Sequence, residues 1–278
     1  MSTPNGTSVH PLVEENRRLK EQLARLNRDR IEYLQNVAHQ LVAPLNAIKW
    51  HIENLTEGRL SIDRIKKVMR SIYSQATQAV HLAKNFALMS NLEADHTLAA
   101  LREPLQPVNL CQLLVNLADD YQPQGWDKEV DISVENQALD SAPPVLVIKP
   151  LVSQVFSNII ENAVKYSSPR SKIAINGSYD STSDTVTVNV RNDGIRLKPE
   201  ETPRVFERGY RAPHAKNAYP AGTGFGLYIA KKIVDIHEGV IGCTVTPKGS
   251  VIFSVKLPVK ALEGKTRQRE PKDRSASR

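Results

Sequence analysis

Apolar residues recur at alternating steps of three and four along residues 31–55, and this repeat constrains the fold more strongly than any other feature of the sequence. Such spacing places the apolar side chains on one face of an α-helix and is typical of helices that pack side by side. A second repeat of the same kind covers residues 62–89. The first comprises Ile31, Leu34, Ala38, Leu41, Leu45, Ile48, Ile52 and Leu55, and the second comprises Ile62, Ile65, Met69, Ile72, Ala76, Ala79, Ala83, Phe86 and Met89. Two helices with one apolar stripe each cannot bury both stripes alone, so the sequence predicts a homodimer that forms a four-helix bundle.

A shorter repeat precedes these two. It comprises Leu12, Leu19, Leu23 and Leu26, with Asn16 at a seam position. Leucines at this spacing are typical of a coiled coil, and an Asn in the seam favours two strands in one register. Because this repeat is offset by one residue from the next, we expect a stutter near residues 23–27 that locally unwinds the supercoil.

His39 lies one residue beyond a seam position, so its ring is expected to flank the bundle and meet solvent. Pro44 follows five residues later and leaves the carbonyl of Gln40 without its helical partner, which is expected to bend the helix beside His39. A proline inside a helix costs about 3 kcal/mol, so its presence favours a functional role for this segment. The remaining histidines of comparable interest are interpreted as solvated surface residues: His51, His81, His96 and His237.

From Asn109 onward the helical repeat gives way to shorter segments of both kinds. Helices are expected at 110–121, 151–166 and 224–238, and strands at 130–134, 145–148, 173–179, 185–191, 240–246 and 251–257. Strands and helices that mix without regular alternation favour an α+β sandwich, in which helices cover one face of a sheet. The fold class is therefore a multidomain α and α+β protein.

The sequence divides into four predicted regions. Residues 1–26 form a disordered N-terminus and coiled coil, residues 27–100 form the helical hairpin, and residues 105–258 form the α+β domain. The tail, residues 259–278, is charged and without periodic apolar residues, so it is expected to be disordered.

Composition excludes several classes of function. The net charge is +7, but the tail from Lys260 holds seven Lys and Arg against three Asp and Glu, so the remainder is close to neutral and nucleic-acid binding is not favoured. Cys111 and Cys243 stand alone, which predicts neither a disulfide framework nor a zinc site. No apolar run reaches the length of a membrane span, so a soluble, cytoplasmic protein is expected.

One predicted helix carries an unusual polar stripe. Asn158, Asn162, Lys165 and Tyr166 share a face of residues 151–166, opposite an apolar face. Asn is a poor helix former, and Mg²⁺ accepts an amide oxygen beside phosphates. The stripe therefore indicates a site for Mg²⁺ and phosphate; the alternative is a solvated helix surface.

Three further motifs follow in order: Asn192-Asp193-Gly194, the segment 205–211, and Gly222-Thr223-Gly224-Phe225-Gly226-Leu227. With the helix described above and with residues 38–48 around His39, they resemble the N, G1, F, G2 and phosphoacceptor boxes of two-component sensor histidine kinases. The resemblance covers roughly residues 28–258. It implies a phosphotransfer hairpin followed by an ATP-binding domain of the GHKL type.

The resemblance implies roles for the residues of the polar stripe. Asn162 matches the Mg²⁺ ligand, and Lys165 and Tyr166 match positions that approach the phosphates. Asn158 stands where related ATPases carry a glutamate that activates water, and an amide cannot act as that base. Glu161 lies at a different helical angle and is expected to face solvent.

The later boxes complete the implied nucleotide site. Asn192 stands in place of the usual aspartate that accepts the adenine amino group, and Arg196 replaces the family's second glycine. Arg211 matches a position that reaches the terminal phosphate, whereas Arg208 is interpreted as a solvated residue. The remaining nucleotide-binding candidates are Gly194, Gly222, Thr223, Gly224, Gly226 and Leu227, whose glycines let backbone N–H groups approach phosphates.

The resulting hypothesis is an ATP- and Mg²⁺-dependent protein-histidine kinase. His39 receives the γ-phosphoryl group and passes it to an aspartate of a separate response regulator. Gln40 departs from the family pattern, because a carboxylate usually follows the phosphoacceptor histidine. Two alternatives stay open: a GHKL-fold ATPase, and a non-catalytic dimeric scaffold that binds a response regulator. The input signal is not readable from the sequence.

Overall fold

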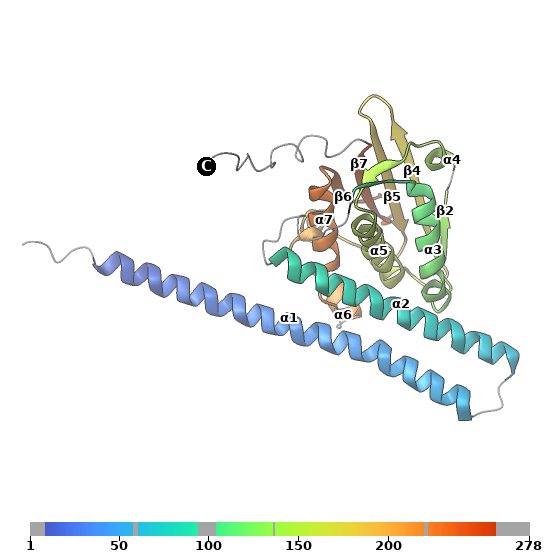
Figure 1. The fold of residues 1–278 in the computed structure, drawn as a ribbon, viewed down its shortest axis with the longest axis horizontal. Coiled ribbons are helices and arrows are strands. Elements are labelled where there is room, and N and C mark those ends of the chain that lie inside the picture. Colours follow the sequence, from blue (N-terminus) through green and yellow to red (C-terminus); the bar gives the residue numbers. More distant parts are fainter. Residues whose placement is uncertain (1–8, 58–60, 94–103, 136, 220–221, 260–278) are drawn as a thin grey trace, which may run out of the picture.

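The computed structural model describes residues 9–57, 61–93, 104–135, 137–219 and 222–259 (Figure 1). It comprises a long helical hairpin and an α/β domain. In Figure 1, helix α2 lies between helix α1 and the α/β domain. His96 and the tail from Lys260, for which expectations are given above, lie outside the described residues.

The hairpin consists of α1 (Val9–Glu57) and α2 (Ile62–Glu93), which pack along one another. Helix α1 begins within the region predicted to hold a disordered N-terminus and a coiled coil, and it continues through Pro44 without a break. About half of the apolar seam is exposed in the single chain. The large exposed seam residues are Ile31, Leu34, Leu45, Ile52, Ile62, Ile65 and Met69, with exposures from 40% for Ile65 to 72% for Ile62. One hairpin therefore does not bury all of the apolar surface of α1 and α2.

The α/β domain is built on a five-stranded sheet in the order β2-β4-β5-β7-β6. Only the β2–β4 pair is parallel. The strands are β2 (Asp131–Val134), β4 (Lys172–Asp180), β5 (Thr185–Asn192), β6 (Val240–Val245) and β7 (Val251–Pro258). Strands β1 (Gln106–Val108) and β3 (Val145–Val147) form a separate antiparallel pair.

Three main helices cover one face of this sheet: α3 (Leu110–Trp126), α5 (Lys149–Tyr166) and α7 (Gly226–Ile236). The other short elements are α4 (Gln137–Asp140), α6 (Pro213–Ala218) and two 3₁₀ turns, η2 (Pro199–Glu201) and η3 (Arg204–Phe206). The predicted α+β sandwich is confirmed. Helix α3 runs five residues beyond its expected end, through Pro123.

The core lies between the helices and the sheet. On β5, Val186, Val188 and Val190 are at most 1% exposed and alternate with partly exposed residues, as a strand with one covered face requires. On α5, the predicted apolar face is buried: Phe156, Ile159, Ile160 and Ala163 are all at most 1% exposed. This burial fixes the rotation of α5, so its polar stripe is directed away from the sheet.

Contacts along α2 hold the hairpin against the α/β domain. The hydroxyl of Tyr73 donates to Asp120 at 2.7 Å, and the guanidinium of Arg70 lies 4.9 Å from the ring centre of Trp126. Both partners belong to α3. Farther along α2, the contacts pass from α3 to α5, which brings the hairpin to the polar stripe.

The interpretation of the other histidines as solvated was wrong for His81 and His237. His81 is 4% exposed and His237 is fully buried. His237 accepts a hydrogen bond from the backbone N–H of Ile148 at 3.1 Å, and burial lowers its pKa. His51 is partly buried, and its Nε2 lies 2.8 Å from the hydroxyl of Ser71. Each ring contacts a residue that is distant in sequence, so its burial depends on tertiary packing.

Candidate functional site

A cavity lies where α5, the end of β5, the start of α7 and the hairpin meet. All the residues predicted to bind nucleotide line this cavity except Gly194. They are Asn158, Asn162, Lys165, Tyr166, Asn192, Arg211, Gly222, Thr223, Gly224, Gly226 and Leu227. Arg196 also lines it, and the hairpin contributes Gln40, Leu82 and Asn85. Four motifs that are distant in sequence therefore converge on one space.

His39 is exposed on α1 and is not among the lining residues, whereas its neighbour Gln40 is half-buried in the cavity wall. Successive helical residues point about 100° apart, which accounts for this difference. The cavity thus reaches the residue next to His39.

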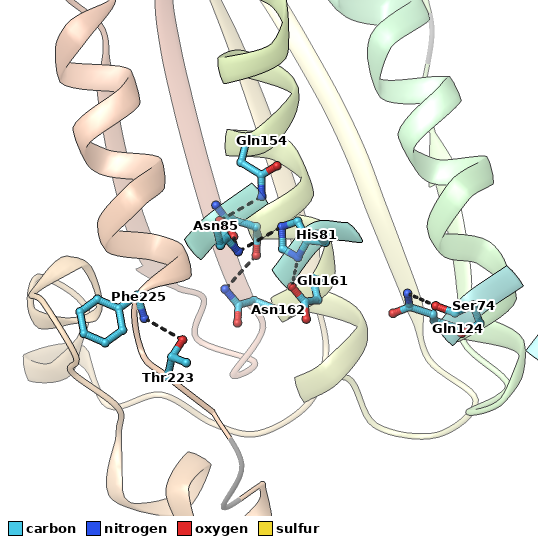
Figure 2. Close-up of polar contacts among 10 residues, drawn as sticks. Ser74, His81, Asn85, Gln124, Gln154, Glu161, Asn162, Thr223 and Phe225 are labelled. Carbon is cyan, nitrogen blue, oxygen red and sulfur yellow. Dashed lines mark hydrogen bonds and ion pairs between the residues drawn. The ribbon is translucent and has the colours of Figure 1, made fainter. Parts of the chain in front are cut away.

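The amide of Asn162 is oriented by its own helix. Its Nδ2 donates to the backbone carbonyl of Asn158 at 2.9 Å. The side-chain oxygen is consequently directed away from this bond, as Figure 2 shows. Oxygen is the amide atom that binds Mg²⁺. The orientation of Asn162 therefore fits the predicted metal site.

Positive charge gathers at the C-terminal end of α5. The Lys165 ammonium lies 5.6 Å from the ring centres of both Tyr166 and Tyr219. Burial lowers the pKa of Lys165, and the charges of Arg211 and Lys128 lower it further, against the opposite effect of Glu161. An anionic ligand would offset this mutual repulsion of cations, which makes the cavity suited to phosphate.

Lys128 reinforces the same end of the helix. Its ammonium donates to the carbonyls of Val164 and Lys165, at 3.1 and 2.5 Å, and to the hydroxyl of Tyr219 at 2.6 Å. A cation at the last carbonyls of a helix complements the helix dipole. Lys128 therefore joins the end of α5 to the segment after α6, a contact that no motif indicated.

Arg211 is held by backbone carbonyls of the segment around α6. It donates to Ala215 at 3.2 Å, to Gly222 at 2.9 Å, and also to Tyr219. It lines the cavity as predicted, and contact with a phosphate stays a prediction. Arg208 is exposed and lies 5.7 Å from the ring centre of Phe225, in keeping with the interpretation of a surface residue.

The expectation that Glu161 faces solvent was wrong. Its side chain is 25% exposed, and its carboxylate lies 2.5 Å from Nδ1 of the buried His81 on α2. Burial opposes ionisation of Glu161, but the charge and hydrogen bond of His81 outweigh burial and lower its pKa. Sequence reasoning also missed Asn85 and Gln154. The available signal was that His81 and Asn85 lie four residues apart and so share a face of α2.

The side chains of Asn192 and Asp193, at the end of β5, have different surroundings. Asn192 is 3% exposed and lines the cavity, whereas Asp193 is directed toward Arg191, with a closest distance of 3.6 Å. This arrangement fits the assignment of Asn192, rather than Asp193, to the adenine-binding position.

Gly194 contributes to packing rather than to the cavity wall. A Cβ at this position would lie 1.9 Å from the carbonyl oxygen of Tyr166. The same close approach allows the N–H of Ile195 to donate to Tyr166, at 2.9 Å. Gly194 thus lets the end of β5 cross the end of α5, which bears the polar stripe.

Replacing Gly194 with alanine is expected to lower the free energy of unfolding by about 3 kcal/mol or more, because two backbone segments would have to separate. Urea denaturation of the purified chain measures this. Gly242→Ala is the matched control, since nothing lies within 4 Å of a Cβ there, and its effect should stay within about 1 kcal/mol. Equal effects of the two substitutions would contradict the packing role.

The comparison with protein families matches residues 148–261 to the histidine kinase-, DNA gyrase B- and HSP90-like ATPase family. This region holds the four converging motifs and most of the residues that line the cavity. A domain of this type implies ATP binding.

Relatives extend the similarity to the hairpin. The chain is 28% identical over 211 residues to the histidine protein kinase SaeS of Staphylococcus epidermidis, covering 74% of this chain and 56% of the relative. It is 27% identical over 235 residues to SaeS of Staphylococcus aureus, covering 84% of this chain and 65% of the relative. The chain therefore spans roughly 56 to 65% of the length of these curated relatives.

Solved structures show the same fold. Full-length ShkA in complex with AMPPNP has a TM-score of 0.54 at 21% identity, covering 87% of this chain and 46% of that one. Histidine kinase ThkA in complex with response regulator protein TrrA has a TM-score of 0.50 at 19% identity, covering 92% and 68%. The resemblance read from the sequence is confirmed: the chain is a relative of two-component sensor histidine kinases. No helix in the described residues is both long and apolar enough to cross a membrane.

Proposed function

We propose that this chain binds ATP with Mg²⁺ and transfers the γ-phosphoryl group to His39. The observation that carries the proposal is the position of Gln40, which follows His39 in the sequence and lines the same cavity as the predicted nucleotide-binding residues. The acceptor and the nucleotide site thus belong to neighbouring surfaces of one folded chain.

The chemistry assigned to the site is an in-line transfer. A ring nitrogen of His39 forms a bond to the γ-phosphorus as the bond to the bridging oxygen breaks, ADP departs with the electron pair, and the ring proton passes to a base or to solvent. Lys165 and Arg211 would stabilise charge on the transferred group. Asn162 would hold Mg²⁺, which neutralises phosphate charge when bound. Because His39 does not line the cavity, transfer requires movement of the domain on the hairpin, or His39 of a second copy.

The proposed assembly is a homodimer formed through the exposed seam of α1 and α2. Burial of the exposed apolar residues supplies the driving force, at roughly 25 cal/mol for each Å² removed from water. The proposed receiver of the phosphoryl group is an aspartate of a separate response regulator.

The ATPase alternative receives little support from the site. Asn158 offers an amide where a water-activating base is needed, and the carboxylate of Glu161 is occupied by His81. Incubation of the chain with γ-labelled ATP separates the three possibilities. Acid-labile label on the protein supports the kinase, free phosphate alone supports an ATPase, and neither product supports a non-catalytic scaffold.

Asn162→Ala is expected to weaken Mg²⁺-dependent ATP binding by about tenfold or more, because it removes the oriented amide oxygen from the metal site. Titration calorimetry with and without Mg²⁺ measures the effect. Asn116→Ala, which removes an exposed amide from α3, is the control. Unchanged Mg²⁺ dependence in Asn162→Ala would refute the assignment of the metal ligand.

A further inference from the structure

Helix α2 contributes two polar side chains to a continuous set of hydrogen bonds with α5 (Figure 2). Nε2 of Gln154 donates to Oδ1 of Asn85 at 3.0 Å, and Nδ2 of Asn85 donates to Oδ1 of Asn158 at 2.8 Å. The same Nδ2 lies 3.4 Å from Nε2 of His81. Nδ1 of His81, in turn, lies 2.5 Å from Glu161. We call these five residues the amide relay.

The relay determines which way each amide points. Nδ1 of His81 is the ring nitrogen that faces Glu161, so Nε2 is the one that faces Asn85. Nδ2 of Asn85 donates to Asn158, and its Oδ1 accepts from Gln154. Reversing Asn85 alone would place its Nδ2 against the donor of Gln154 and its Oδ1 against the acceptor of Asn158, so these two partners favour the orientation described.

Asn158, at the end of the relay, has one hydrogen-bond donor without a partner among the described residues. Its side chain is 1% exposed, its Oδ1 is occupied by Asn85, and its Nδ2 is buried with no partner among the described residues. An unpaired buried donor costs about 1–3 kcal/mol. Since Asn158 lines the cavity, a phosphate oxygen of a bound nucleotide is a chemically suited acceptor.

We propose that Asn85 of the hairpin is a positioning residue of the nucleotide site, which holds Asn158 as a hydrogen-bond donor to a phosphate oxygen. This rests on the proposed ATP binding and goes beyond it, because it makes docking of α2 part of the site. The two amides one turn apart on α5 then have opposite roles. Asn162 presents an oxygen to the metal, and Asn158 presents an N–H to the phosphate.

Asn85→Asp tests the proposal, because a carboxylate still accepts from Gln154 but also takes the free donor of Asn158. Binding of AMPPNP with Mg²⁺ to the full chain, measured by calorimetry, is expected to weaken by about tenfold or more. The same substitution is made in an Asn158→Ala background. There the loss should fall to about threefold or less, because only the added charge remains.

Controls separate positioning from general disruption. Tyr73→Phe removes a hydrogen bond between α2 and α3 outside the relay and should leave AMPPNP affinity unchanged. If Asn85→Asp does not fold, Asn85→Leu replaces it in both backgrounds. The expected loss of AMPPNP affinity is then smaller, and it should disappear in the Asn158→Ala background. Equal losses in both backgrounds overturn the proposal while leaving ATP binding intact. Absence of AMPPNP binding by the unmodified chain overturns the proposed function and, with it, this inference.

Discussion

His39→Ala is expected to abolish acid-labile labelling of the chain by γ-labelled ATP while leaving AMPPNP affinity unchanged. Alanine has no nitrogen to form the bond to phosphorus. The affinity is unaffected because His39 is exposed on α1 and does not line the cavity. Scintillation counting of protein resolved on a gel, with calorimetry on the same preparation, measures both quantities.

His51→Ala is the companion variant, because His51 is another imidazole on α1. It lies 2.8 Å from Ser71 between the two helices of the hairpin, so its loss should affect hairpin stability more than labelling. Labelling of His39→Ala at the rate of the unmodified chain would show that another residue accepts the phosphoryl group.

Gln40→Glu is expected to accelerate labelling of His39 by a factor of roughly 10² or more, because a positioned general base typically contributes about 10² to 10⁴ in rate. Glutamine can orient the ring of His39 but cannot take its proton. A carboxylate at this half-buried position beside the cavity can do both. Single-turnover labelling at saturating ATP isolates this chemical step from nucleotide binding.

The matched control for this variant is Gln35→Glu, which adds the same charge at an exposed position of α1 outside the cavity wall. It should leave the labelling rate unchanged. A Gln40→Glu variant that labels no faster than the unmodified chain would indicate that proton removal does not limit the transfer. The ring proton would then leave readily to solvent.

Local periodicity accounts for most of the fold that could be predicted from the sequence. The three-four repeats defined α1 and α2, and the alternating valines of β5 and the apolar face of α5 defined the two layers of the core. The cavity could be anticipated as well, because its motifs carry glycine and amide patterns within short segments. Dimerisation, phosphotransfer and the roles of individual site residues stay predictions.

The sequence by itself determined the main helices and strands, the direction of their apolar faces and the presence of Asn162 and Lys165 on one polar stripe. Only the tertiary structure decided that His81 is buried against Glu161 and that Asn85 reaches Asn158. The physical reason is that periodicity specifies which side of a helix is apolar, but it does not specify which other helix meets its polar side. The orientation of an amide depends on the partner that the other helix brings, so the donor on Asn158 emerges only when α2 docks on α5.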